Sequence, residues 1–111
     1  MARHRVIGVD ELPEGEMGKF EVGGRTICLA NIKGTGFRAL DDRCTHEDES
    51  LSEGFLCAGE VECPAHGSRF NFLTGEVSGL PATVPARVYD VTVDGEGVYV
   101  DINADASSSV A

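Results

Sequence analysis

Two short segments of the chain each combine one cysteine with one histidine. Residues 44–46 read Cys-Thr-His and, after sixteen intervening residues, residues 63–66 read Cys-Pro-Ala-His. Thiolate and imidazole are both strong metal ligands, and a short loop can place one of each on the same side. A lone cysteine is more often a small buried apolar residue, so the inference depends on all four together. The predicted ligands are Cys44, His46, Cys63 and His66.

Two kinds of metal centre use two cysteines and two histidines. One is a tetrahedral zinc site, but zinc motifs usually pair Cys with Cys and His with His. The other is a [2Fe–2S] cluster of the Rieske type, with two cysteines on one iron and two histidines on the other. Each half of the present motif is mixed, which favours the iron–sulfur cluster. A structural zinc module stays open as an alternative.

The spacing resembles the Rieske motif, C-x-H followed about sixteen residues later by C-x-x-H. The resemblance continues through residues 60–77 and Leu80-Pro81-Ala82, and it covers about residues 4–102. It implies that Cys44 and Cys63 bind one iron and that His46 and His66 bind the other. It also implies that Pro81 lies in a loop that shields the cluster.

Departures from the respiratory Rieske proteins indicate which kind of cluster this is. Those proteins resemble C-T-H-x-x-C and C-P-C-H-G-S, with a disulfide between the loops, whereas Glu49 and Ala65 stand at the two positions here. Ser68 matches a serine that bonds a bridging sulfide, but Phe70 replaces a tyrosine that bonds a ligand sulfur. Fewer donors stabilise the reduced cluster less, which predicts a reduction potential of about −150 to 0 mV, low in the Rieske range.

The elements that position these loops are predicted to be β-strands, because short runs of alternating apolar and polar residues are separated by glycine-rich turns. The resemblance implies an all-β fold of antiparallel, sandwich-like sheets with a cluster-binding subdomain of two hairpin loops. One domain, 1–103, is expected, followed by a disordered tail at 104–111; residues 10–15 fit a helical turn or a loop. The expected strands are 4–9, 17–22, 25–32, 37–40, 60–63, 68–73, 86–93 and 97–102.

Charge and composition limit the partners and the location. The net charge of −10 disfavours nucleic acid and anionic membrane surfaces. No run approaches the ~18 apolar residues of a membrane span, and no secretory signal is visible, so a soluble cytoplasmic protein is expected. Thiols stay reduced in the cytoplasm. Disulfides are therefore not expected. Cys28 lies in an apolar strand pattern, and we expect both Cys28 and Cys57 to pack in the core; we assign no role to His4.

By resemblance, the chain is a soluble ferredoxin that passes single electrons from a flavoprotein reductase to the terminal oxygenase of a multicomponent aromatic-ring dioxygenase. The sequence contains no second metal-binding motif and no dinucleotide fingerprint, so an electron carrier rather than an enzyme is predicted. Two alternatives are the small subunit of an assimilatory nitrite reductase and a donor to another oxygenase. Six acids between residues 41 and 54 are expected to orient docking: Asp41, Asp42, Glu47, Asp48, Glu49 and Glu53.

Overall fold

The computed structural model describes residues 3–45, 49–65, 67–78 and 84–105. Nearly all of their regular structure is β-strand, which confirms the all-β prediction. The helical elements are two 3-10 turns, η1 (Val9–Glu11) and η2 (Leu51–Glu53). The strands are β1 (Arg3–Gly8), β2 (Met17–Val22), β3 (Arg25–Ile32), β4 (Gly36–Asp41), β5 (Phe55–Cys57), β6 (Glu60–Glu62), β7 (Arg69–Asn71), β8 (Val88–Asp94) and β9 (Gly97–Asp105).

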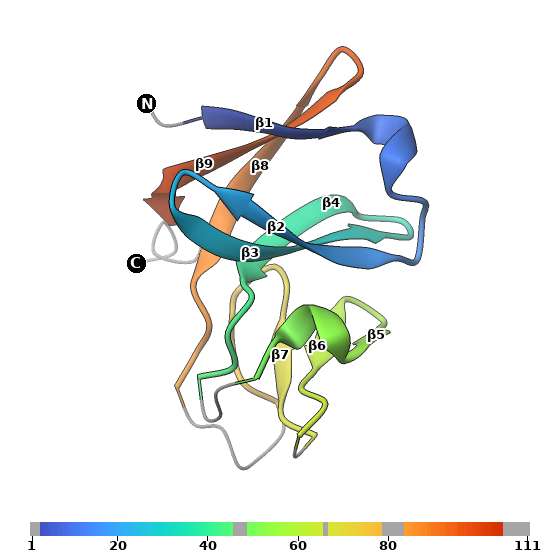
Figure 1. Cartoon of the computed structure of the whole chain (residues 1–111). Coiled ribbons are helices and arrows are strands. Elements are labelled where there is room, and N and C mark those ends of the chain that lie inside the picture. The colour runs from blue at the N-terminus through green and yellow to red at the C-terminus, as the bar shows by residue number, and fades with distance from the viewer. Residues whose placement is uncertain (1–2, 46–48, 66, 79–83, 106–111) are drawn as a thin grey trace.

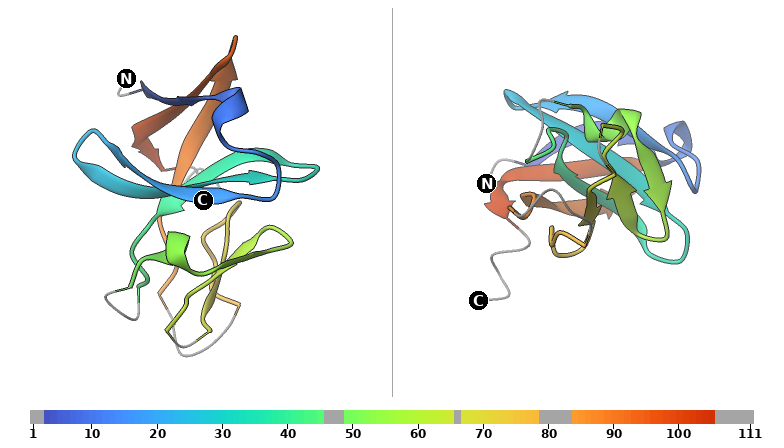
Figure 2. Two further views of the ribbon diagram at one scale, coloured as in Figure 1. Left: turned by 45° about the vertical axis from the view of Figure 1, so that its right-hand side comes forward. Right: turned by 90° about the horizontal axis from the view of Figure 1, so that it is seen from below.

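The strands form two antiparallel sheets of different size. The larger sheet has the order β1-β9-β8-β4-β3-β2, and the smaller has the order β5-β6-β7. Figures 1 and 2 show the smaller sheet at one end of the larger one. The larger sheet curls, so that the β2–β3 turn at Gly23 comes against Ile102 of β9 and His4 of β1. None of the described helical segments has the length and apolar character of a membrane span.

Most predicted strands agree with the structure apart from their ends: β8 begins at Val88 rather than 86, and β9 continues to Asp105, past the expected end at 102 and into the expected tail. The larger differences lie in the smaller sheet. The expected strand 68–73 ends at Asn71, because the Asn71 side-chain oxygen accepts hydrogen bonds from the amides of Leu73 (2.7 Å) and Thr74 (3.2 Å). Such a local bond turns the chain away from the sheet. The sequence prediction missed β5, whose three residues are too few to show an alternating pattern.

Side chains on the two faces of the central strands enter two different cores. Because successive residues of a strand point to opposite faces, Ile27 and Leu29 face one way while Cys28 and Ala30 face the other. The upper core is enclosed by the curled large sheet and contains Ile7, Leu12, Val22, Ile27, Leu29, Ala39, Tyr89, Val98 and Val100. The lower core joins the two sheets and contains Cys28, Ala30, Ile32, Leu40, Cys44, Leu51, Val61, Cys63, Phe70, Phe72, Ala86 and Val88.

The smaller sheet belongs to an insertion between two paired strands. The chain leaves the large sheet at Asp41 and re-enters it at Val88, and these neighbouring strands pair Leu40 with Val88. The Asp41 amide donates to the Arg87 carbonyl at 2.9 Å, which closes the base of the insertion. We call residues 42–87 the subdomain. Both of its ends are therefore anchored on adjacent strands.

Candidate metal centre

The structure places the two predicted cysteine ligands in the same core. Cys44 is 2 % exposed and Cys63 is 1 % exposed, and both belong to the lower core. The other two predicted ligands, His46 and His66, lie outside the described residues. The structure thus brings together the thiol half of the predicted site.

Cys44 lies in a hairpin that follows β4, which we call the first ligand loop (residues 42–51). Its amide donates to the Glu49 carbonyl at 3.0 Å, and the Leu51 amide donates to the Asp42 carbonyl at 2.5 Å. An isolated bridge pairs Arg43 with Ser50 between these bonds. The chain therefore returns on itself, and Cys44 lies on the first arm of this hairpin.

Cys63 lies in a second hairpin, between β6 and β7, which we call the second ligand loop (residues 63–68). The Cys63 amide donates to the Ser68 carbonyl at 2.7 Å, and the Gly67 amide donates to the Cys63 carbonyl at 3.1 Å. Gly67 has φ +78°, a left-handed conformation that favours glycine because it has no Cβ. These two hairpins confirm the predicted pair of loops.

The described residues that flank the predicted shield contact the surroundings of both ligand loops. Pro81 itself lies outside the described residues, but the chain on either side of it is held. On one side, the Ser78 amide donates to the Arg69 carbonyl at 2.9 Å, next to the second ligand loop. On the other side, the Val84 carbonyl accepts from the Thr45 hydroxyl at 2.6 Å. Ser78 and Val84, the described residues on either side of 79–83, thus each bond to a residue in or next to a ligand loop.

The described half of the donor set, the two thiols, fits a [2Fe–2S] cluster. Thiolates are its cysteine ligands, and Cys28, Cys44 and Cys57 form no disulfide in the described part of the chain. Ser68 is 1 % exposed beside Cys63, and Phe70 is fully buried in the lower core. Ser68 and Phe70 are the two residues on which the prediction of a low reduction potential was based, because Ser68 has a hydroxyl to donate and Phe70 has none.

The two cysteines outside the motif have different environments. Cys28 is fully buried, its Sγ lies 3.8 Å from the Met17 Sδ, and its prediction as a core residue is confirmed. Burial, and to a smaller extent the charge of Asp42, raises the pKa of the Cys28 thiol, so this thiol stays protonated. The same prediction for Cys57 was wrong, because Cys57 ends β5 on its exposed side while Leu56 packs against the lower core.

Sequence reasoning missed the role of two acids at the base of the first ligand loop. Asp42 is only 3 % exposed, and its carboxylate accepts hydrogen bonds from the Ser52 amide (2.8 Å) and the Ser50 hydroxyl. The Asp41 carboxylate accepts from the Tyr89 hydroxyl at 2.5 Å. The expectation that all six acids orient docking was therefore wrong for Asp42, which faces the interior. No local sequence pattern separates a buried Asp42 from its exposed neighbours.

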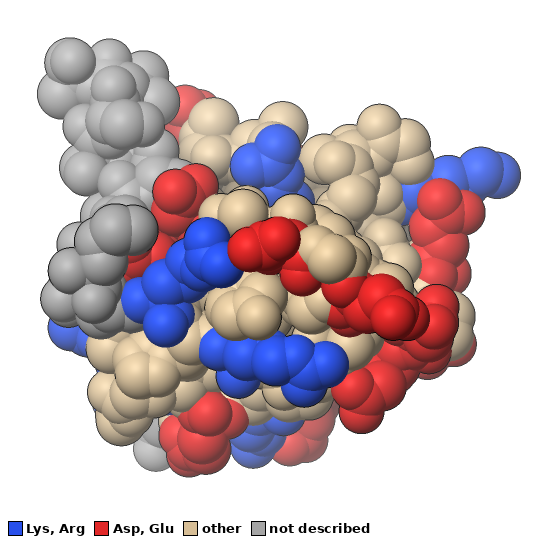
Figure 3. Space-filling model, turned by 90° about the horizontal axis from the view of Figure 1, so that it is seen from above, with Lys and Arg blue, Asp and Glu red and all other residues tan. Residues whose placement is uncertain are grey.

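The other acidic side chains are distributed beyond the two ligand loops. Glu49 and Glu53 are exposed, whereas Glu47 and Asp48 lie outside the described residues. Figure 3 shows the end of the molecule opposite the subdomain, where acidic side chains gather at one side and basic ones lie across the middle. The negative charge is thus not confined to the ligand loops.

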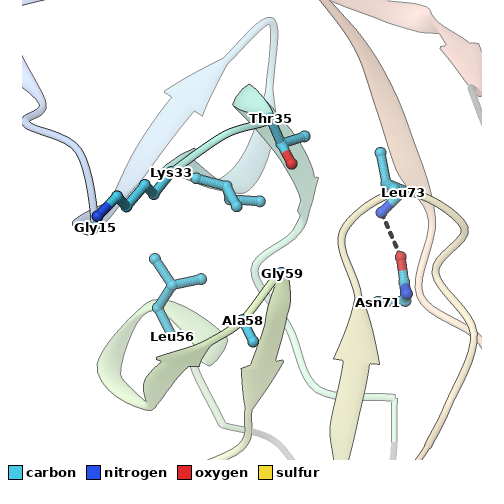
Figure 4. A pocket seen from close by; sticks show the side chains of 9 residues that line it. Gly15, Lys33, Thr35, Leu56, Ala58, Gly59, Asn71 and Leu73 are labelled. Carbon is cyan, nitrogen blue, oxygen red and sulfur yellow. Dashed lines mark hydrogen bonds between the residues drawn. The ribbon is translucent and has the colours of Figure 1, made fainter.

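A pocket lies between the two sheets (Figure 4), and neither Cys44 nor Cys63 is among its described lining residues. Among its described lining residues, Lys33 alone has a titratable side chain. Acid–base catalysis needs a positioned proton donor or acceptor of suitable pKa, and the apolar and small residues around Lys33 do not supply such a set. The lining consists of Gly15, Ile32, Lys33, Thr35, Leu56, Ala58, Gly59, Asn71 and Leu73.

Comparisons with known proteins match these features. The model of the Rieske [2Fe-2S] domain family matches residues 2–90. The ferredoxin component of biphenyl 2,3-dioxygenase from Rhodococcus jostii (strain RHA1) is 40 % identical over 102 residues, covering 92 % of this chain and 94 % of that protein.

Solved structures show the same likeness. The ferredoxin of carbazole 1,9a-dioxygenase from Nocardioides aromaticivorans IC177 has a TM-score of 0.85 and 34 % identity, over 90 % of this chain and 97 % of that chain. A chain in a complex of reduced oxygenase and oxidized ferredoxin of carbazole 1,9a-dioxygenase has a TM-score of 0.83 and 36 % identity, over 90 % and 93 %. A putative nitrite reductase small subunit, at 19 % identity and a TM-score of 0.76, shares the fold alone.

Proposed function

Because the chain belongs to the Rieske [2Fe–2S] domain family, we propose that it is a ferredoxin that carries single electrons to the terminal oxygenase of an aromatic-ring dioxygenase. A bound cluster of this type takes up and releases one electron at a time. The observation that carries the proposal is the burial of Cys44 and Cys63 in one core by two separate hairpin loops. The chain itself supplies no substrate chemistry in this proposal and is not an enzyme.

We assign four ligands to the cluster. Cys44 and Cys63 bind one iron, and His46 and His66 bind the other, as in the motif that the sequence resembles. Support comes from the change in exposure along each loop. Cys44 is buried while Thr45 is exposed, and Cys63 is buried while Pro64 and Ala65 are exposed. His46 and His66 directly follow these exposed residues in the sequence. We therefore propose that the electron leaves the cluster through the histidines, on the exposed side of the loops.

The proposed partners are a flavoprotein reductase, which donates the electron, and a terminal oxygenase, which receives it. The oxygenase is supported by the ferredoxin–oxygenase complex of carbazole 1,9a-dioxygenase, to which this chain is similar. We place the protein in the cytoplasm, where thiols such as Cys28 and the exposed Cys57 stay reduced. A donor to another kind of oxygenase would need the same cluster and differs only in its partner.

The experiment that tests the proposal is absorption and electron paramagnetic resonance spectroscopy of the purified protein, oxidised and dithionite-reduced. We expect a reddish-brown protein with a Rieske-type signal in the reduced state. His46→Ala and His66→Ala should each abolish the signal, whereas His4→Ala, which removes the third histidine of the chain, should preserve it. A colourless protein that binds zinc would overturn the proposal in favour of a zinc module.

Transfer to the partner is tested separately. The reduced protein should lose its signal when mixed with an aromatic-ring oxygenase, and bound aromatic substrate should then be hydroxylated. Oxidation by the large subunit of a nitrite reductase, without oxidation by the oxygenase, would support the alternative function. That alternative has support at the level of the fold alone.

A further inference from the structure

Asp42 is a buried carboxylate at the base of the first ligand loop. Its side chain accepts from the Ser52 amide at 2.8 Å and from the Ser50 hydroxyl, while its main-chain carbonyl accepts from the Leu51 amide at 2.5 Å. Both oxygens of the carboxylate, Oδ1 and Oδ2, therefore accept a hydrogen bond. One residue thus ties the start of the first ligand loop to its end.

Asp42 also lies close along the chain to the predicted ligand Cys44. Asp42 precedes Cys44 by two residues, so their Cα atoms are at most about 7 Å apart. The backbone of Asp42 is also fixed, because its amide donates to the Thr26 carbonyl of β3 at 3.1 Å. Cys28, which belongs to the same core as Cys44, is close enough for the charge of Asp42 to raise its pKa. Asp42 is thus held against β3, the strand that carries the lower-core residue Cys28.

A buried charge acts more strongly than an exposed one. At 3 % exposure, Asp42 has little water around it to screen its field, and salt screens buried charges far less than exposed ones. Glu53, on the turn that follows the first ligand loop, is an exposed carboxylate of the same formal charge. Glu53 therefore serves as the exposed control for the buried Asp42.

We propose that Asp42 is a positioning residue that holds the first ligand loop closed and whose buried charge lowers the reduction potential of the cluster bound there. This inference rests on the proposed function, since it requires the cluster. Adding an electron increases the negative charge of the centre. A fixed negative charge nearby opposes that addition, so the oxidised form is favoured.

The test is voltammetry of the holoprotein and of two isosteric variants, Asp42→Asn and Glu53→Gln. Asp42→Asn should shift the reduced-to-oxidised ratio at a fixed potential about tenfold towards the reduced form, which is a rise of about 59 mV for one electron. Glu53→Gln should shift the ratio less than twofold. Raising the salt from low to high ionic strength should remove the Glu53 effect and leave the Asp42 effect.

A second variant separates charge from loop distortion. Ser50→Ala removes one donor to the carboxylate but keeps its charge, so the less compensated charge should lower the potential. If Asp42→Asn and Ser50→Ala move the potential in the same direction, the shift reports distortion and the proposal is overturned. It is also overturned if Asp42→Asn moves the potential no more than Glu53→Gln.

The remaining outcomes are also decisive. Should Asp42→Asn yield no folded holoprotein, a lowered potential in Ser50→Ala supports the proposal and an unchanged potential overturns it. Failure of the proposed function gives a different result, because the unaltered protein would then show no Rieske-type signal. If the wild-type protein shows that signal and the variants have the wild-type reduction potential, the role of Asp42 is refuted and the proposed function stands.

Discussion

The large sheet and the subdomain are stabilised in different ways. Strands of the large sheet contain six to nine residues, whereas each strand of the small sheet contains three. The subdomain depends instead on side-chain hydrogen bonds such as those of Asp42, Asn71 and Thr45. Its core also includes the two proposed cysteine ligands. The difference teaches that strand pairing alone can hold the large sheet, and it predicts that the subdomain gains stability from the proposed metal centre.

The strongest test of this comparison removes a ligand. Cys63→Ser should abolish the visible absorption of the cluster completely, because one iron loses a thiolate. Hydrogen exchange should then accelerate in the subdomain while the amides of β3 and β9 stay protected. Cys57→Ser, an exposed cysteine on the same small sheet, is the control and should leave both properties unchanged. Loss of protection throughout the large sheet would contradict the comparison.

Matched core substitutions sharpen the same difference. Leu29 in the upper core and Leu51 in the lower core are both fully buried. Each change to alanine should lower the free energy of unfolding by about 2–5 kcal/mol, since both leave a cavity. Leu51→Ala should in addition speed the release of the cluster, measured as bleaching after dilution into chelator, whereas Leu29→Ala should not. Equal bleaching rates would show that the two cores are not independent.

The junction between the two regions should respond to alkaline pH. Burial, and then the hydrogen bond to Asp41 with its charge, raises the pKa of Tyr89 above its ordinary value of 10.0, and Arg25 opposes the shift. A raised pKa in the folded state means that this stabilisation is present below about pH 10 and is lost as the pH rises through the folded value.

Substitution of Tyr89 measures that contribution. Tyr89→Phe should lower the free energy of unfolding at pH 7 by about 1.5–3 kcal/mol, the range for a hydrogen bond to a charged group. The variant should also show a weaker loss of stability above pH 10, followed by circular dichroism in denaturant. An unchanged alkaline profile would assign the loss to other groups, such as Cys28, whose pKa is also raised.

The smallest expected effect concerns the potential itself. Phe70 is fully buried behind the second ligand loop, and Phe70→Tyr adds the hydroxyl that the respiratory proteins have there. One extra donor of about 1–2 kcal/mol should raise the reduction potential by about 40–90 mV from a starting value of about −150 to 0 mV. Protein-film voltammetry measures the reduction potentials of the wild type and of Phe70→Tyr. A strongly positive wild-type potential would contradict the predicted starting value.

The sequence predicted the features that depend on local pattern. Alternation predicted β2 and β3, and the C-x-H and C-x-x-H spacing predicted two hairpin loops around Cys44 and Cys63. It did not predict β5, where three residues carry too little pattern, or the exposure of Cys57. Asp42 is buried where the Ser50 hydroxyl and the Ser52 amide bond to its carboxylate. These partners are eight and ten residues away in the sequence, so the residues directly around Asp42 do not predict its burial. The ligand assignment and the 1–103 domain boundary remain predictions.

The insertion of the subdomain between β4 and β8 has a consequence for protein engineering. Its ends leave from paired residues, Leu40 and Val88, so a short turn that joins 41 to 88 would turn β4 and β8 into a hairpin. The six-stranded sheet would then be a single unbroken scaffold onto which other loop pairs could be transplanted. Its lower face would carry a bare apolar strip of Cys28, Ala30, Leu40 and Val88. Any transplanted module must therefore have an apolar surface that covers this strip, as the native subdomain does.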